Sequence, residues 1–251
     1  MTGSERTLKT EAIVLRHSDW GEADRLLTLF TSYKGKIRAI AKGVRKLNSR
    51  KAGHLEPFTQ ANLMLAQGRD FWIVTQAEMM ESFSPIRENL ELTGATAYII
   101  ELTDRFTYEA QENHNLYQLL AETLKRLSGG EDIFITTRYF EMRLFDHLGY
   151  RPQLFNCVNC GKEIQPEDQY FSREKGGILC PSCGRKTVQA SAVSMDALKY
   201  LRHFQRSSFP EAKRVKIQPA IHQEMESLIR EYITYLLERG LNTPDFISAI
   251  R

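Results

Sequence analysis

Four cysteines form two closely spaced pairs in the second half of the chain. They are Cys157, Cys160, Cys180 and Cys183, in the pattern C-x2-C-x19-C-x2-C. Two intervening residues allow each turn to direct both thiolates at one centre, and four sulfurs complete the tetrahedral shell that zinc accepts. A glycine follows each pair, Gly161 and Gly184, where a tight turn can use a positive φ. The pattern predicts one structural Zn²⁺ ion that folds an insertion at about residues 153–188.

Other chemistry fits the sequence less well. A redox dithiol of the thioredoxin type needs one such pair, and a catalytic zinc would keep one coordination position open to water. The chain contains no G-x-x-x-x-G-K-[ST], G-x-G-x-x-G or H-E-x-x-H motif. Its six histidines are scattered, and no nucleophile stands beside a convincing base. We expect no catalytic residues, and a zinc-dependent nucleic-acid hydrolase is the weakest of three hypotheses for the function.

The positive charge of the chain is concentrated in residues 34–51, KGKIRAIAKGVRKLNSRK, which we call the basic segment. Its eight cations are Lys34, Lys36, Arg38, Lys42, Arg45, Lys46, Arg50 and Lys51. The chain carries a net charge of +3, so without these eight charges it would carry −5. Such a concentration predicts a surface that binds a polyanion. The alternatives are a mobile, solvated charge run or a targeting signal of the nuclear type.

Nucleic acid is the polyanion that the neighbouring aromatic residues favour. Proteins that bind single strands combine a cationic groove with aromatic side chains on which bases stack. Trp20 and Trp72 are stacking candidates, and Tyr33 and Phe71 are further ones. Because Phe71 and Trp72 are neighbours in an expected strand, one should face inward and the other outward. A membrane surface is a weaker alternative, since no amphipathic helix carries the basic segment.

Five strand-like runs precede residue 83. They cover residues 11–19, 24–32, 36–43, 58–67 and 70–82, with glycine turns between several of them. In the third run small or apolar side chains alternate with cations, which places the cations on one face. Residues 44–58 are expected to form a long basic loop. This pattern predicts a small antiparallel barrel at residues 1–83.

After Pro85 the apolar residues recur at helical spacing. Expected helices cover residues 90–106, 116–127, 133–148, 194–204 and 221–237. The fourth begins at Ser194 with an incomplete capping box, because Ala197 stands where Glu would complete it. We therefore predict a multi-domain α+β protein, in which a mainly helical domain at residues 84–251 carries the zinc-binding insertion.

The composition is typical of a globular cytoplasmic protein. Hydrophobic residues make up 42% of the 251 and charged residues 26%, which is enough apolar material for a core. No run of about 18 apolar residues is present, which argues against a membrane span. The first residues, MTGSERTLKTEAIVLRHSD, carry charges on both sides of a short apolar core, which argues against a secretory signal.

Several stretches are similar to one known family. They are TEAIVLRHSDWGEADRLLTLFTSYKGKIRAIAKGVRK at residues 10–46, LEPF at 55–58, FWIVTQAE at 71–78 and GYRPQLFNCVNCG at 149–161. Together with a helical second half, they resemble the bacterial DNA repair and recombination family RecO over nearly the full length. The resemblance implies an N-terminal OB-fold, a helical domain with a zinc-binding insertion, and no catalytic turnover. All four cysteine ligands are present, although some relatives lack them.

The resemblance also implies a function and partners. Family members bind single- and double-stranded DNA, anneal complementary strands, and act with RecR to help load RecA onto DNA coated by single-stranded-DNA-binding protein. The chain would then act at the nucleoid. The acidic tail of the single-stranded-DNA-binding protein needs an apolar groove ringed by cations, and the helical half offers Lys199, Arg202, Arg206 and Arg214. The alternative is a zinc-ribbon scaffold whose basic loop docks an acidic protein partner, with DNA binding incidental.

Overall fold

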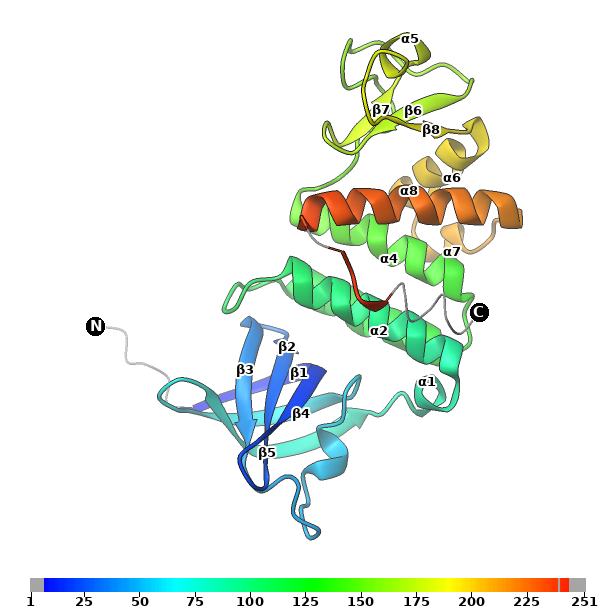
Figure 1. The fold of residues 1–251 in the computed structure, drawn as a ribbon. Coiled ribbons are helices and arrows are strands. Elements are labelled where there is room, and N and C mark those ends of the chain that lie inside the picture. The colour runs from blue at the N-terminus through cyan, green and yellow to red at the C-terminus, as the bar shows by residue number, and fades with distance from the viewer. Residues whose placement is uncertain (1–6, 239, 244–251) are drawn as a thin grey trace. The chain divides into compact units, whose positions relative to one another are not determined.

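The computed structural model describes residues 7–238 and 240–243 (Figure 1). The chain forms two compact units. The first contains the described residues up to Gly130 together with Thr243, and the second runs Glu131–Asn242. The helices that directly follow the barrel therefore belong to the first unit. The expected division after residue 83 would separate the barrel from these helices, and it stays a prediction.

The first unit is built on a closed barrel of five strands. They are β1 (Thr7–Trp20), β2 (Asp24–Thr31), β3 (Gly35–Ala41), β4 (Gln60–Gln67) and β5 (Trp72–Glu81). The order around the barrel is β1-β2-β3-β5-β4, and β4 pairs with β1 to close it. Neighbouring strands are antiparallel except β3 and β5, which pair in parallel. The predicted five-stranded, OB-like barrel is confirmed, whereas the expectation of antiparallel pairing was wrong for β3 and β5, whose ends meet in parallel to close the barrel.

Alternation along the strands fills the barrel with apolar side chains. In β3, Ile37, Ala39 and Ala41 are buried, and the residues between them are partly or fully exposed, as predicted. The core also includes Val44 and Leu55 from the connection between β3 and β4. This connection is therefore anchored in the barrel near both of its ends.

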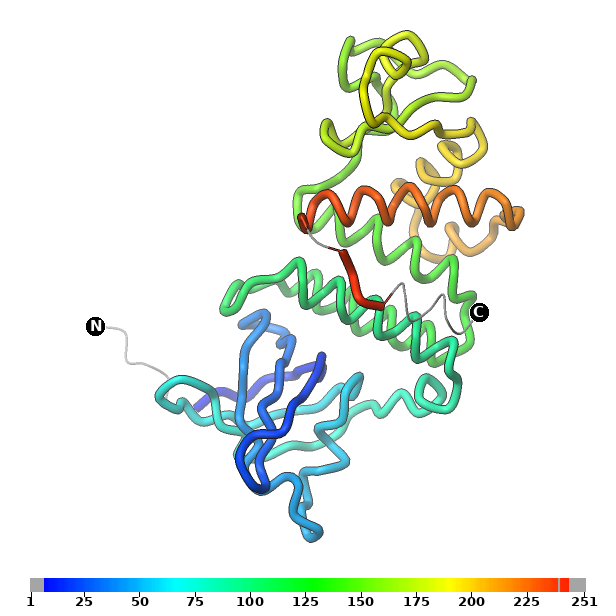
Figure 2. Tube along the Cα trace, in the orientation of Figure 1, coloured from blue at the N-terminus to red at the C-terminus, as the bar shows by residue number. Residues whose placement is uncertain are grey.

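The connection between β3 and β4, residues 42–59, is called the β3–β4 loop below. It contains a short 3-10 helix, Ala52–His54, which the sequence did not predict. Figure 2 shows its light-blue path extending beyond the end of the barrel. At its start, the backbone N–H of Gly43 donates to Asp24 Oδ1 at 2.7 Å, and that of Arg45 donates to the carbonyl oxygen of Ala23 at 2.9 Å. The base of the loop is thus held against the turn between β1 and β2.

Glu56, in the second half of the β3–β4 loop, joins the loop to the barrel. Its carboxylate lies 2.8 Å from Nη1 of Arg25 and 3.3 Å from Nε2 of His17. Burial alone would raise the pKa of Glu56, but hydrogen bonds from Arg25 and His17 outweigh it and hold this pKa below 4.5. A lowered folded-state pKa stabilises the fold at neutral pH, and this contribution is lost as the pH falls below 4.5. Urea midpoints of the wild type and Glu56→Gln should differ at neutral pH and converge in acid. A difference between the two urea midpoints that does not change with pH would contradict this role of the Glu56 carboxylate.

Three helices follow the barrel in the described part of the first unit. They are α1 (Ser84–Glu88), α2 (Leu90–Phe106) and α3 (His114–Ser128). The side-chain oxygens of Asn89 and Asn113 accept backbone N–H bonds in the first turns of α2 and α3, and so cap both helices. The amide of Gln60 in β4 donates to the hydroxyl of Tyr117 in α3 at 3.2 Å, which ties this helix to the barrel.

The second unit combines helices with a small sheet. Its helices are α4 (Ile133–Leu148), α5 (Pro181–Gly184), α6 (Met195–Arg206), α7 (Phe209–Ala212) and α8 (Pro219–Leu237), and its strands are β6 (Gln169–Ser172), β7 (Gly177–Leu179) and β8 (Ser191–Val193). β6 is the central strand of this antiparallel sheet. The ring of Tyr232 in α8 lies between those of Phe145 in α4 and Phe171 in β6, at centroid distances of 5.2 and 5.4 Å. Within residues 7–238 and 240–243, no helix is long and apolar enough to cross a membrane.

The start of α6 is capped from two elements. Ser194 Oγ accepts a hydrogen bond from the backbone N–H of Ala197 at 3.1 Å. The carboxylate of Glu224 in α8 takes the place of the missing glutamate, because it accepts bonds from the backbone N–H and the hydroxyl of Ser194 at 2.6 and 2.7 Å. We expect Glu224→Ala to lower the free energy of unfolding by about 1 kcal/mol. In urea unfolding, the exposed neighbour Gln223→Ala serves as the control, and equal midpoints for the two variants would rule out this capping role.

Candidate metal centre and nucleic-acid interface

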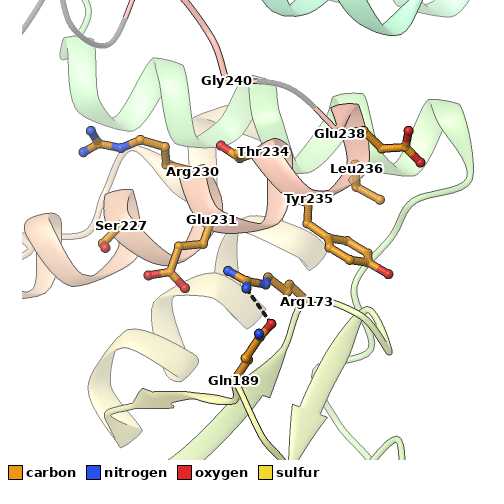
Figure 3. Close-up of a pocket in the computed structure, with 10 residues that line it drawn as sticks. All are labelled: Arg173, Gln189, Ser227, Arg230, Glu231, Thr234, Tyr235, Leu236, Glu238 and Gly240. Atoms are coloured by element: carbon orange, nitrogen blue, oxygen red, sulfur yellow. Dashed lines mark hydrogen bonds between the residues drawn. The ribbon is translucent and has the colours of Figure 1, made fainter.

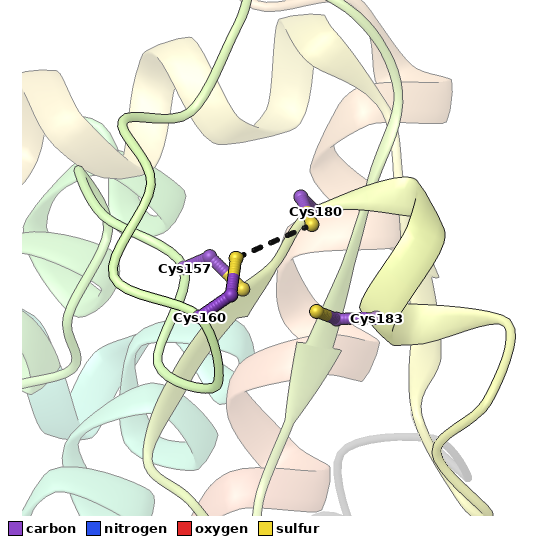
Figure 4. Close-up of side chains that lie close together, drawn as sticks. All are labelled: Cys157, Cys160, Cys180 and Cys183. Atoms are coloured by element: carbon purple, nitrogen blue, oxygen red, sulfur yellow. Dashed lines mark hydrogen bonds between the residues drawn. The ribbon is translucent and has the colours of Figure 1, made fainter.

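Two turns bring the four cysteines together in the second unit (Figure 4). Cys157 and Cys160 lie in the chain before β6, whereas Cys180 precedes α5 and Cys183 lies within it. All four Sγ atoms lie within 4.8 Å of one another, and those of Cys160 and Cys180 are 3.8 Å apart. A tetrahedron with metal–sulfur distances of about 2.3 Å has edges of about 3.8 Å. The four thiols are therefore positioned to bind a metal ion.

Backbone hydrogen bonds shape both turns. The N–H of Gly161 donates to the carbonyl oxygen of Cys157, and that of Gly184 donates to the carbonyl oxygen of Cys180, both at 2.8 Å. Gly161 has a φ of +74°, as predicted. The prediction was wrong for Gly184, whose φ is not in the left-handed region. A Cβ atom there would lie 2.3 Å from the ring of Tyr170, so glycine is needed for close packing.

Polar groups near Cys180 favour its thiolate form. A hydrogen bond with the Ser182 hydroxyl at 3.2 Å and the backbone N–H of Cys183 lower the pKa of Cys180 to about 6. The side-chain amide of Asn159 donates to Sγ of Cys183 at 3.4 Å, and Lys175 Nζ holds this amide by donating to its oxygen. Because the thiolate is the form that binds metal, the groups beside Cys180 favour metal binding at this sulfur.

Two cations of the basic segment, on strand β3, are paired with carboxylates. Lys36 Nζ lies 3.0 Å from Oδ1 of Asp104 in α2, and Arg38 Nε lies 2.7 Å from Oε1 of Glu109 in the loop after α2. The side chain of Lys36 is only 13% exposed. Sequence reasoning missed these pairs because the carboxylates come from a distant part of the chain. Lys36 and Arg38 are therefore less available to a polyanion than their position on the outer face of β3 suggested.

Three cations of the β3–β4 loop are exposed and form no ion pair within the described residues. Lys42, Lys46 and Arg50 are exposed. Among the residues that the structure describes, no carboxylate forms an ion pair with any of the three. We call these three residues the loop cations. They present positive charge that no carboxylate of the described residues neutralises through an ion pair.

The remaining three cations of the basic segment are neither as fully paired as Lys36 nor as exposed and unpaired as the loop cations in the described structure. Arg45 Nη2 is 3.2 Å from Oδ2 of Asp19. Lys51 Nζ donates to the carbonyl oxygen of Val74 at 3.1 Å, and Lys34 is half-buried in the turn between β2 and β3. The eight predicted residues are thus on one unit, but they do not contribute equally to its exposed charge.

An aromatic pair lies beside β3. The rings of Trp20 and Phe71 meet edge to face with centroids 5.7 Å apart, and the guanidinium of Arg38 lies 5.0 Å from the Phe71 centroid. Trp20 is 43% exposed, whereas Trp72 packs against the barrel core. Trp20 is the last residue of β1, next to the loop between β1 and β2, and Phe71 lies in the loop between β4 and β5. OB-folds bind oligonucleotides through these two loops and the face of strands 2 and 3. The geometry therefore favours Phe71 over Trp72 as a partner of Trp20 in base stacking.

A groove in the second unit lies beside α8 (Figure 3). Arg173, Arg230, Glu231 and Glu238 contribute charges of both signs to its lining. The guanidinium of Arg173 donates to the side-chain oxygen of Gln189 at 2.7 Å. Because these four charges balance, the groove is less suited to a polyanion than the β3–β4 loop.

Known proteins resemble the chain over nearly its full length. The family model described as Recombination protein O N terminal matches residues 4–83, and the one described as Recombination protein O C terminal matches residues 87–245. The DNA repair protein RecO of Roseiflexus sp. (strain RS-1) is 42% identical over 98% of this chain and 87% of its own length. The proteins of the same name from Dehalococcoides mccartyi (strain ATCC BAA-2266 / KCTC 15142 / 195) and Thermoanaerobacter sp. (strain X514) are 39% and 33% identical. These matches cover 92% and 98% of this chain, and 91% and 99% of the relatives.

Proposed function

The chain belongs to the RecO family of DNA repair proteins, and we propose that it binds single- and double-stranded DNA. It anneals complementary strands without a catalytic step. With RecR, it assists the loading of RecA onto DNA coated by single-stranded-DNA-binding protein, at the nucleoid in the bacterial cytoplasm. The observation that carries the proposal is the set of loop cations, on the same barrel as the pair Trp20 and Phe71.

Annealing follows from the physics of such a surface. Two DNA strands repel each other through their phosphates, and cations that neutralise phosphates lower this repulsion. Contacts to phosphate and stacking on aromatic rings carry little sequence information, so binding should tolerate many sequences. The loop cations supply the first kind of contact, and Trp20 with Phe71 supplies the second.

We propose Zn²⁺ as the metal of the four-cysteine site. Cys157, Cys160, Cys180 and Cys183 would hold it, and a zinc ion bound there would supply cross-linking of the two turns. Four thiolates leave no coordination position for water or substrate, so the role is structural.

Binding and annealing can be measured on the same samples. Fluorescence anisotropy with labelled single- and double-stranded oligonucleotides of several sequences should show binding to both forms, and the protein should accelerate annealing of complementary strands. Absence of binding to either form at low salt would refute the proposal. Displacement of DNA by an acidic peptide, without any effect on annealing, would favour the protein-docking scaffold.

The ion pair between Arg38 and Glu109 should compete with DNA. Glu109→Gln releases the guanidinium of Arg38 beside Phe71, so we expect DNA affinity at low salt to rise about two- to five-fold, as the strength of an exposed ion pair implies. Glu112→Gln is the matched control, because Glu112 is exposed in the same loop. If both variants bind DNA equally well in anisotropy titrations, the pair does not compete.

A further inference from the structure

Leu47 is an apolar side chain at an exposed position of the β3–β4 loop. Its relative exposure is 104%, whereas Val44 and Leu55 of the same loop are 1% and 0% exposed. A single exposed leucine is ordinary on a protein surface. The surroundings of Leu47 are unusual, because two exposed cations flank it. Lys46, which forms no ion pair with the described residues, directly precedes it, and Arg50 follows three residues later.

The backbone around Leu47 has a defined shape. The N–H of Lys46 donates to the carbonyl oxygen of Gly43 at 3.2 Å, and the N–H of Ser49 donates to the carbonyl oxygen of Lys46 at 2.9 Å. Leu47 lies in the second of these turns, and the first contains Val44, which is part of the barrel core. The side chain is therefore presented outward by an ordered loop, and little further ordering is needed when it contacts a ligand.

We propose that Leu47 inserts between neighbouring bases of bound DNA, while Lys46 and Arg50 contact the phosphates beside the inserted step. This inference rests on the proposed DNA binding and adds a role for one residue in it. Proteins that separate stacked bases use apolar wedges such as leucine, flanked by cations that hold the backbone. Bases that are held apart cannot restack within their own strand, which leaves them available to a complementary strand.

The charges around Leu47 argue for DNA as the partner. Docking on an apolar protein surface would remove water from Lys46 and Arg50, and no carboxylate of the described chain is positioned to pair with them. The phosphates of a DNA strand supply negative charge on both sides of each base step. A wedge between two cations matches this pattern.

The fluorescence of 2-aminopurine tests the insertion directly, because it rises when this base loses its stacking neighbours. The probe is an oligonucleotide with 2-aminopurine between two adenines, in single-stranded and duplex form. We expect wild-type protein to raise the fluorescence several-fold at saturation. Leu47→Ala should lose most of this rise while its affinity falls less than about three-fold, because the phosphate contacts remain. Val188→Ala is the control, since Val188 is 86% exposed in the second unit.

A second variant separates insertion from binding. Leu47→Lys should bind DNA at least as tightly as the wild type, because it adds a cation, and it should still give no rise in fluorescence. A rise that persists in Leu47→Ala and Leu47→Lys overturns the wedge. Wild-type protein that binds DNA without any rise also overturns it and leaves the proposed function intact, whereas absence of DNA binding overturns both.

Discussion

Removal of the Zn²⁺ proposed for the four-cysteine site should unfold the chain between about residues 153 and 188 and leave the barrel folded. The two strands of this region, β6 and β7, have only four and three residues, so we expect its turns to depend on bonds between the proposed zinc and the sulfurs. Structural zinc sites contribute apparent free energies of about 10 kcal/mol or more at neutral pH. The barrel has its own core of buried apolar side chains, so we expect it to stay folded without the metal. We expect the same result from Cys160→Ser, because three thiolates do not complete the shell.

The chain offers separate probes for the two regions. Its two tryptophans, Trp20 and Trp72, both lie in the barrel, so their emission reports on the barrel alone. Limited proteolysis reports on the cysteine-containing region. Lys186→Ala serves as the control variant, because it changes a residue beside the site without removing a cysteine. Chelation should increase cleavage between residues 153 and 188 without shifting the tryptophan emission. Unchanged protection from protease after complete metal removal would show that the metal does not hold this fold.

Replacement of Lys42, Lys46 and Arg50 together by alanine should lower DNA affinity by about 10- to 100-fold at low salt. Each of the three is expected to neutralise one phosphate and release its counterion, and all three are unpaired in the described structure. The annealing rate should fall with the affinity, since both depend on charge neutralisation. The barrel should remain folded, because these side chains contribute nothing to its core.

A matched control separates local contacts from net charge. Lys125, Lys199 and Lys216 are exposed lysines outside the barrel, and their triple alanine variant has the same net charge as the loop variant. We expect this control to bind DNA within about two-fold of the wild type. Equal losses in the two triple variants would mean that DNA responds to total charge and not to the β3–β4 loop.

The sequence was sufficient to predict features that depend on local spacing. Each cysteine pair lies within one turn, and the four-cysteine pattern predicted the close approach of the two turns that the structure shows. The barrel was predicted from the alternation of apolar and polar residues, which places Ile37 and Ala39 on one side of β3 wherever the rest of the chain lies. The helical regions were predicted from apolar spacing in the same way.

Pairing between distant residues limited the other predictions. The sequence presented the basic segment as uniform, because Asp104 and Glu109, which pair with Lys36 and Arg38, come from α2 and the loop after it. The cap of α6 was read as incomplete for the same reason, since Glu224 supplies it from α8. Such contacts are decided by tertiary packing, and no local pattern encodes them.

The salt dependence of single-strand binding shows whether the loop cations contact DNA phosphates. For the wild type and the Lys42, Lys46 and Arg50 triple alanine variant, the dissociation constant is measured by anisotropy over a series of salt concentrations. If the loop cations contact phosphates, the slope of log affinity against log salt should be shallower in the variant by about 2, at roughly 0.7 for each lost contact. Parallel slopes for the two proteins would mean that DNA is bound elsewhere and not by the loop cations.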